Sequence, residues 1–325
     1  MKIFPAILLL LCCVQVLGQS ALDTGSHYVR INGFKANYYV RGKGPVCICP
    51  TPGWGPDYWE YTVAFKPLEE YFTLVYFDTR GTGLSEAPED SNYYRYYFAR
   101  DLDALRRRLD QEKIWLVGHS AAGTQVIRYA CLYNKHVNGV ISVAPYWGNE
   151  TTPDPPDTVY INAFLANLDK RKSYPFYDLG KGVFTGSAKV DFTTSLRAVF
   201  PFYFHDTSNV AVYRASAPSQ GGVDDRPGKH DATIVPPYSA YNSNADYQNI
   251  RKVSVPVLLI AGDDDCVSDP AVCASRIHVL IKSSELCVIK NAGHFAWIEQ
   301  PAAFWKGVKD FFAKNRVQPA GQGAN

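Results

Sequence analysis

The amino-acid sequence predicts an α/β fold, in which a mostly parallel β-sheet is flanked by helices and interrupted by one insertion. Two observations lead to this prediction. Short apolar runs typical of strands alternate with stretches whose apolar residues recur at helical spacing, as in parallel sheets with right-handed crossovers. The alternation stops after residue 145 and resumes at residue 251, which indicates a segment inserted into a continuous core.

The two parts of the core are expected over residues 19–145 and 251–314. The segment between them, residues 146–250, is rich in Pro, Gly, Ser and aromatic residues and is interpreted as a lid. The polar tail, residues 315–325, is expected to be disordered. In chain order, we expect three short strands between residues 28 and 48, further strands at 72–77, 114–117, 137–144, 255–261 and 286–289, and helices at 97–109, 121–133 and 302–313.

The first residues, 1–18, are interpreted as a secretory signal that is removed from the mature protein. Lys2 supplies a positive charge, residues 7–16 form an uncharged apolar run, and a small residue, Gly18, ends the segment. This run is too short for a stable membrane anchor, and no later stretch reaches the ~18 apolar residues that a membrane helix needs. We therefore expect a secreted chain that begins near Gln19.

The charge composition gives no indication of a nucleic-acid or anionic-membrane partner. The 33 basic residues nearly balance the 31 acidic residues, and no block of like charges occurs. Asn149 opens an Asn-x-Thr sequon, so the secreted chain is expected to be a glycoprotein. The sequence does not predict an oligomeric state.

The cysteines outside the signal permit disulfides but do not determine a pairing. Cys266 and Cys273 are close together in an expected loop and form the first pair that we expect. Cys47 and Cys49 point to the same face of an expected strand, a geometry unsuited to a bond between them. No cysteine spacing is accompanied by the histidine pair of a zinc site, so no metal is expected.

A serine with the surroundings of a nucleophile follows the strand at 114–117. Residues 117–123 read Val-Gly-His-Ser-Ala-Ala-Gly, where a strand ends and a helix begins. Such a turn strains the serine backbone and presents its hydroxyl above the sheet edge, while small residues at Gly118 and Ala122 let strand and helix approach. Ala122 replaces the last glycine of the Gly-x-Ser-x-Gly pattern and is still small. Ser120 is the predicted nucleophile.

The chain resembles the α/β-hydrolase superfamily, and within it the branch of prolyl-aminopeptidase-like hydrolases and small-molecule esterases. Residues 78–85 (Asp-Thr-Arg-Gly-Thr-Gly-Leu-Ser) match the Asp-x-Arg-Gly-x-Gly-x-Ser segment that follows the fourth strand in that branch. Together with the serine turn and two C-terminal motifs, the resemblance covers nearly the whole mature chain except the lid. It implies an eight-stranded α/β-hydrolase fold, with Asp78 and Arg80 tying a loop near the active site.

The resemblance also implies the acid and the base of a catalytic triad. The chain order in this fold is nucleophile, acid and histidine. The Gly-Asp-Asp-Asp turn at 262–265 follows the seventh strand, and its last residue, Asp265, matches the family's acid, while the two preceding aspartates are interpreted as solvated. His294 lies after the eighth strand in a Gly-His segment similar to the family's. The other histidines are interpreted as surface or packing residues: His27, His119, His136, His205, His230 and His278.

An oxyanion hole is expected on the two sides of the nucleophile. The backbone N–H of Ala121 should supply one donor. The family commonly carries His-Gly-x in the loop after the third strand, where this chain reads Thr-Pro-Gly-Trp-Gly at 51–55. Because proline replaces the histidine, Trp54 is the favoured second donor, with Gly53 and Gly55 as alternatives. Each such donor contributes about 3 kcal/mol to transition-state stabilisation.

These residues predict a serine hydrolase that cleaves an ester, lactone or amide of a small, hydrophobic acyl compound through an acyl-enzyme. No metal or organic cofactor is expected, because the triad needs none and no Gly-rich dinucleotide motif follows the first strand. Aromatic residues of the lid are expected to form its own core or to line the substrate pocket. For the pocket we single out Tyr146, Trp147, Phe202 and Phe295.

Other functions stay open. A carboxylic ester hydrolase is favoured over a prolyl-type aminopeptidase, since the serine turn lacks the Gly-Gly-Ser-Trp-Gly form and no carboxylate of the lid stands out as a receptor for an amino terminus. Ser120 argues against epoxide hydrolases and dehalogenases, which carry aspartate at this turn. A non-catalytic binding or receptor protein on the same fold remains an alternative, as do a lyase and a cofactor-free oxygenase.

Overall fold

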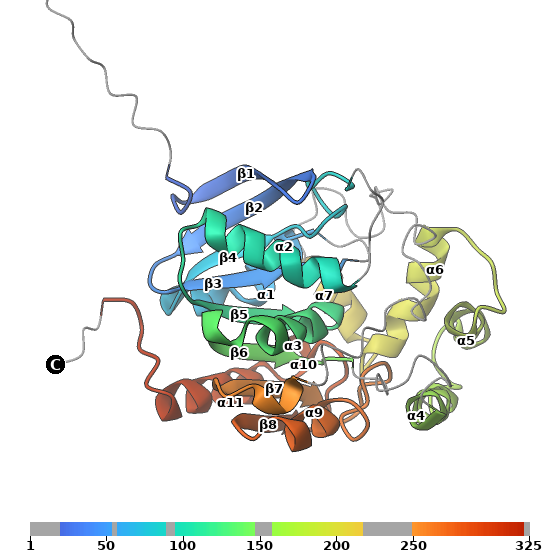
Figure 1. Ribbon diagram of the computed structural model, residues 1–325. Coiled ribbons are helices and arrows are strands. Elements are labelled where there is room, and N and C mark those ends of the chain that lie inside the picture. The colour runs from blue at the N-terminus through green and yellow to red at the C-terminus, as the bar shows by residue number, and fades with distance from the viewer. Residues whose placement is uncertain (1–19, 54–56, 89–94, 147–157, 217–248, 322–325) are drawn as a thin grey trace, which may run out of the picture.

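The computed structural model describes residues 20–53, 57–88, 95–146, 158–216 and 249–321. Its centre is an eight-stranded sheet with the strand order β1-β2-β4-β3-β5-β6-β7-β8 (Figure 1). β2 pairs antiparallel with β1 and β4, and all other neighbours are parallel, which confirms the predicted mostly parallel sheet. The strands are β1 (Gly25–Ile31), β2 (Phe34–Gly42), β3 (Val46–Pro50), β4 (Thr73–Phe77), β5 (Ile114–His119), β6 (Val137–Val143), β7 (Val257–Gly262) and β8 (Ser284–Ile289).

Helices cover both faces of the sheet, because the central strands are apolar on both sides. Along β5, Ile114 and Leu116 belong to one hydrophobic cluster, while Trp115 and Val117 belong to the other. Residues of α2 (Arg95–Arg108), α3 (Ala121–Tyr133) and α9 (Ala274–Leu280) complete the first cluster. The second cluster takes side chains from α1 (Trp59–Ala64), α10 (Ala296–Glu299) and α11 (Pro301–Lys314).

Between β6 and β7 the chain forms a group of short helices beside the sheet. Figure 1 shows α4 (Thr158–Asp169), α5 (Tyr177–Thr185) and α6 (Phe192–Val199) grouped together in yellow and yellow-green. The 3₁₀ turn η3 (Phe200–Tyr203) and α7 (Asn209–Ser216) follow them. These elements fall within the segment that the sequence predicts to be a lid.

The loop after β4 is held by two buried acidic residues, Asp78 and Asp101. The Asp78 carboxylate accepts the backbone N–H groups of Tyr58 (2.8 Å) and Leu84 (2.9 Å), so it ties this loop to the start of α1. Gly83 has φ +50°, and a Cβ there would collide with the Asp78 carboxylate. Burial raises the pKa of Asp78 to about 7.

Arg80 connects the same loop to α2. Its guanidinium donates Nε–H to Asp101 Oδ2 (2.6 Å) and an η2 N–H to Asp101 Oδ1 (2.8 Å), and both side chains are 1% exposed. These contacts agree with the role that the resemblance implies for Asp78 and Arg80, which is to tie this loop. An arginine engaged in this buried bidentate pair is a structural residue.

The cysteine pairing that we expected is wrong. No disulfide joins Cys266 to Cys273, nor any other two cysteines in the described part of the chain. The reason is that the two side chains point into different parts of the core. Cys266 packs with Leu168 and Phe202 on the side of the inserted helices, whereas Cys273 packs into the hydrophobic cluster that contains Ile277.

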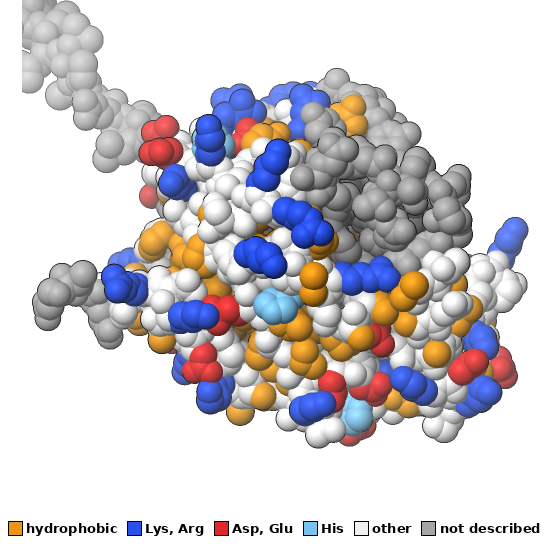
Figure 2. All heavy atoms as spheres, turned by 60° about the horizontal axis from the view of Figure 1, so that its bottom comes forward, with side chains coloured by type: hydrophobic (Ala, Val, Ile, Leu, Met, Phe, Trp, Pro, Cys, Tyr) orange, Lys and Arg blue, Asp and Glu red, His pale blue; other side chains and the backbone are white. Residues whose placement is uncertain are grey.

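Residues 315–321 of the tail contact other parts of the chain. The Ala320 amide donates to the Glu70 carbonyl (2.8 Å), and Val317 packs against the second hydrophobic cluster. The expected signal, residues 1–18, and Asn149 lie outside the described residues. Within the described ranges, no helix has both the length and the apolar character needed to cross a membrane. Figure 2 shows side chains of both charges over the face that it presents.

The Arg80–Asp101 pair yields a stability prediction. Asp101→Ala should lower the free energy of unfolding by about 3–5 kcal/mol, because it leaves the buried guanidinium without its counter-charge. Replacing both residues, Arg80→Met with Asp101→Leu, should restore most of that loss. Urea unfolding followed by circular dichroism measures both changes.

Lys306→Ala is the matched control, because it breaks the exposed Lys306–Asp310 pair (2.6 Å) and should change the free energy of unfolding by at most about 0.5 kcal/mol. Equal losses in the single and double variants would show that volume, not the unpaired charge, determines the effect.

Candidate active site

Ser120 occupies a strained turn between β5 and α3. Its backbone has φ 58° and ψ −126°, a conformation that costs a non-glycine residue about 1–3 kcal/mol. The Ser120 amide donates to the Val143 carbonyl of β6 (2.9 Å), which fixes the turn to the sheet. Gly118 is required for close packing, since a Cβ there would collide with the Ala122 carbonyl oxygen. Close packing of β5 on α3 therefore requires a glycine at position 118.

His294 and Asp265 form a buried hydrogen-bonded pair. His294 Nδ1 lies 2.7 Å from Asp265 Oδ2, and both residues are 1% exposed. The other carboxylate oxygen, Oδ1, accepts hydrogen bonds from the backbone amides of Val267 (2.9 Å) and Ser268 (2.8 Å). These two bonds fix the orientation of the carboxylate. Because a carboxylate only accepts, Nδ1 carries the proton and Nε2 of the neutral imidazole is a base. Nε2 is buried and has no hydrogen-bond partner in the described part of the chain.

Ser120 and His294 line one small hollow, which we call the Ser120 hollow. Its volume is about 10 Å³, the space of roughly one water molecule. Most of its other walls are aromatic, and three of them come from the inserted segment. The lining consists of Pro52, Glu60, Tyr61, His119, Ser120, Phe200, Tyr203, Tyr213, His294 and Phe295.

Of the four predicted pocket residues, Phe295 lines the Ser120 hollow. Phe202 does not, because it is fully buried with Leu168 and Cys266 in the core of the inserted segment. The 3₁₀ turn explains this, since residues three apart share a face, and Phe200 and Tyr203 therefore point to the hollow while Phe202 points away. Tyr146 packs edge-on against Tyr160 instead of lining the hollow. Trp147 lies outside the described residues.

The expected oxyanion donors are described only in part. Ala121 is the first residue of α3, where backbone N–H groups have no acceptor within the helix. Trp54 and Gly55 lie outside the described residues. The preceding loop is tied to α3, since Gln125 Nε2 donates to the Pro52 carbonyl (3.2 Å). Gly53 has φ +88°, and a Cβ there would lie 2.8 Å from the Phe98 ring.

His119 is a site residue that the sequence argument treated as packing. Its Nε2 lies 3.0 Å from the His294 carbonyl oxygen, and its ring centroid is 4.6 Å from that of His294. A carbonyl only accepts, so Nε2 carries the proton, and Nδ1 faces the Tyr61 hydroxyl at 3.4 Å. Burial lowers the pKa of His119 well below its ordinary value, which keeps the ring neutral. His119 therefore supports the backbone of His294.

Glu60 is a second residue of the hollow that sequence reasoning missed. It lies on α1, which follows the loop expected to carry the oxyanion donor, and its side chain is hydrogen-bonded to Tyr213 of α7. Burial raises its pKa to about 7. Its position shortly after the 51–55 loop was the signal in the sequence that could have indicated it.

Asp264, interpreted from sequence as solvated, is 33% exposed and also connects the acid turn to the inserted segment. Its carboxylate contacts Arg171 (3.0 Å) and His205 Nδ1 (2.9 Å), and Arg171 also donates to the Asp264 carbonyl (2.5 Å). The Arg171 side chain is 2% exposed, whereas the Asp264 side chain is 33% exposed, so this contact lies at the edge of the inserted segment. The turn that holds Asp265 is thereby fixed to residues that follow α4 and η3.

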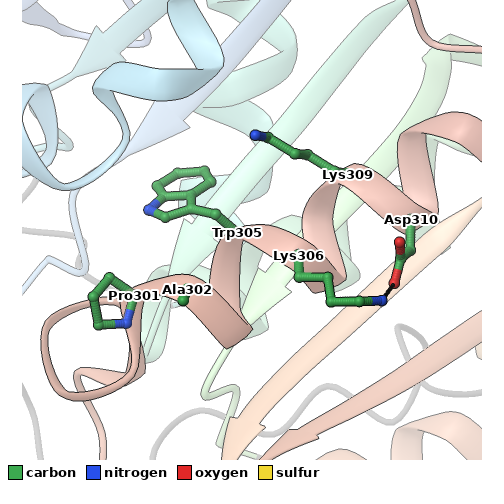
Figure 3. A pocket seen from close by; sticks show the side chains of 6 residues that line it. All are labelled: Pro301, Ala302, Trp305, Lys306, Lys309 and Asp310. Atoms are coloured by element: carbon green, nitrogen blue, oxygen red, sulfur yellow. Dashed lines mark hydrogen bonds and ion pairs between the residues drawn. The ribbon is translucent and has the colours of Figure 1, made fainter.

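No group of three His, Cys, Asp or Glu side chains in the described ranges is arranged to hold a metal ion. A larger hollow, about 530 Å³, lies on the outer face of α11, where Figure 3 shows Trp305, Lys306 and Lys309 along one helix. None of its lining residues belongs to the Ser120 hollow.

An eight-stranded sheet with a serine turn after β5, an aspartate after β7 and a histidine after β8 defines the α/β-hydrolase fold. The chain belongs to the alpha/beta hydrolase fold family, whose family model matches residues 44–301.

Two similar proteins and one solved structure illustrate the range of this family. Human 1-acylglycerol-3-phosphate O-acyltransferase ABHD5 is 26% identical over 85% of this chain and 79% of its own length. The proline iminopeptidase of Saccharolobus solfataricus is 23% identical over 86% of this chain and 89% of its own. The solved meta-cleavage product hydrolase CumD of Pseudomonas fluorescens IP01 has a TM-score of 0.65 at 20% identity, covering 89% and 97% of the two chains. At this identity the structural likeness concerns the fold alone.

Glu60 should make the stability of the folded protein depend on pH. Its pKa of about 7 exceeds its ordinary value of 4.5, so the folded protein binds this proton more tightly than the unfolded chain. This stabilisation is complete below about pH 4.5 and is lost as the pH rises to about 7. Glu60→Gln, which cannot ionise, should therefore melt about 2–4 °C above the wild type at pH 8 and show no such gain at pH 4.5.

Thermal melts by circular dichroism at the two pH values measure this difference, and Glu112→Gln on an exposed side chain is the control. A gain for Glu60→Gln of the same size at both pH values would contradict an effect of ionisation.

Proposed function

We propose that this protein is a serine hydrolase in which Ser120 is the nucleophile, His294 the general base and Asp265 the residue that orients the base. The observation that carries the proposal is that His294 lines the same hollow as Ser120. Its Nδ1 is bound to Asp265, and its Nε2 has no hydrogen-bond partner among the described residues. A serine at a strained turn, next to a buried base whose tautomer is determined, has the features of an activated nucleophile. The name of one similar protein, the proline iminopeptidase of Saccharolobus solfataricus, supports this reading.

The reaction follows from the protonation states. The Ser120 oxygen attacks the substrate carbonyl while Nε2 of His294 accepts the hydroxyl proton, and Asp265 stabilises the imidazolium. The amide of Ala121, with Trp54 or a neighbouring glycine, stabilises the oxyanion. Collapse of the tetrahedral intermediate expels the leaving group, which takes the proton from His294 and leaves an acyl-serine. A water molecule deprotonated by His294 then releases the acid.

The aromatic walls of the Ser120 hollow favour an apolar acyl compound, and an ester or lactone is the first candidate substrate. Secretion as a glycoprotein remains part of this proposal, on the signal-like N-terminus and the sequon at Asn149. We include no cofactor and no metal in the reaction.

A prolyl-type aminopeptidase is the second candidate, and one observation favours it. Glu60 lines the Ser120 hollow with an ionisable carboxyl, and an amino terminus could bind there. This carboxylate comes from the core helix α1, whereas the sequence argument looked for one in the lid. The Saccharolobus solfataricus relative is named a proline iminopeptidase.

Purified mature protein should hydrolyse aryl esters, a lactone or proline-naphthylamide, and Ser120→Ala or His294→Ala should lower kcat/KM by about 10⁴-fold or more. Asp265→Asn should lower kcat by about 10⁴-fold, because it permits the wrong imidazole tautomer. Initial rates measure these effects, and a fluorophosphonate should label the wild type but not Ser120→Ala.

The matched controls are Ser187→Ala and His136→Ala, two side chains outside the Ser120 hollow that should leave the rates unchanged. Preferred cleavage of the naphthylamide, weakened by Glu60→Gln, would favour the aminopeptidase. Absence of both turnover and labelling would leave the non-catalytic binding protein as the better reading.

A further inference from the structure

A second hollow, which we call the α7 groove, lies on the other side of one wall of the Ser120 hollow. Its volume is about 300 Å³, against about 10 Å³ for the Ser120 hollow. Its lining comes from α1, the 3₁₀ turn η1 (Lys66–Glu70), α7, α10 and α11. Most of it is apolar and includes Val63, Pro67, Val212, Trp297, Ile298 and Trp305.

Glu60 and Tyr213 belong to both hollows, and they are hydrogen-bonded to each other. This pair therefore forms the partition between the reacting serine and the groove. The Tyr213 ring is otherwise held by aromatic contacts to Phe200 (4.8 Å between centroids) and Phe295 (4.9 Å). It is carried by α7, and Val212, the preceding residue of this helix, is 51% exposed.

The groove has the properties of a ligand site for an uncharged chain. Val63 on α1 and Val212 on α7 are 40% and 51% exposed, so apolar side chains from two separate helices face solvent in one depression. Among the described residues that line it, none is Lys, Arg or His. Its volume lies at the lower end of the range for small-molecule sites, whereas the Ser120 hollow alone has room for little more than the reacting atoms.

We propose that the α7 groove binds an aliphatic chain of the substrate, and that the chain reaches Ser120 past the Glu60–Tyr213 partition. This inference rests on the proposed hydrolase function for its reaction, but the groove itself is a binding site. The chain can belong to the acyl half or to the alcohol half of an ester. The substrate class is accordingly an ester with a medium-length aliphatic chain.

The test fills the groove from one wall. For each variant, kcat/KM for p-nitrophenyl octanoate is divided by kcat/KM for p-nitrophenyl acetate. Val212→Trp should lower this ratio at least about tenfold, because about two methylene groups of the octanoyl chain are no longer buried in the groove. If the chain belongs to the alcohol half, the ratio of octyl acetate to methyl acetate falls instead. Val63→Trp fills the groove from α1 and should lower the same ratio as Val212→Trp. It also serves if Val212→Trp does not fold.

Val279→Trp is the matched control, because Val279 is 65% exposed on α9 and does not line the groove, so both ratios should keep their wild-type values. Ratios that stay at the wild-type value in both groove variants, while Ser120→Ala still abolishes turnover, would overturn the groove and leave the hydrolase proposal intact.

Binding without catalysis separates the two proposals. Octyl acetate should bind to Ser120→Ala, measured by calorimetry, and Val212→Trp in that background should raise Kd at least about tenfold. If the wild type hydrolyses no ester and this binding persists, the groove stands and the hydrolase proposal fails. If octyl acetate does not bind, or binds equally well with Val212→Trp, the groove proposal is overturned.

Discussion

The constraint on which the site depends is the left-handed backbone of Ser120. No regular helix or strand contains this conformation, so it persists only because its neighbours enforce it. The Ser120 amide is bound to β6, Gly118 lets the turn approach α3, and α3 begins at the next residue. The parallel sheet thus places Ser120 in the same hollow as a buried histidine.

The histidine is in turn held from three directions. Asp265 determines its tautomer, His119 supports its backbone carbonyl, and its own amide donates to the Tyr203 carbonyl (2.7 Å). Tyr203 belongs to the inserted segment, and Asp264, beside the predicted acid, contacts Arg171 and His205 from the same segment. The insertion therefore takes part in building the site as well as in covering it.

Sequence reasoning succeeded where a residue's role depends on its neighbours in the chain. The expected range of α3 agrees with the structure, and strands and helices were placed within a few residues because their apolar periodicity is local. It failed for Phe202, for Glu60 and for the Cys266–Cys273 pair. In each case the outcome depends on which way a side chain points in an irregular or short element, and periodicity says little about such elements.

The sequence alone determined the fold class, the order of its elements and the three residues proposed for the triad. These features depend on strand–helix alternation and on motifs at strand ends, and both are patterns of consecutive residues. Only the tertiary structure decided that Glu60 and Tyr213 meet beside Ser120, that His119 supports His294, and that a groove lies beyond them. These contacts join α1, α7 and the ends of β5 and β8, which are far apart in the chain. Their proximity results from how helices pack on a finished sheet, and no local pattern encodes it.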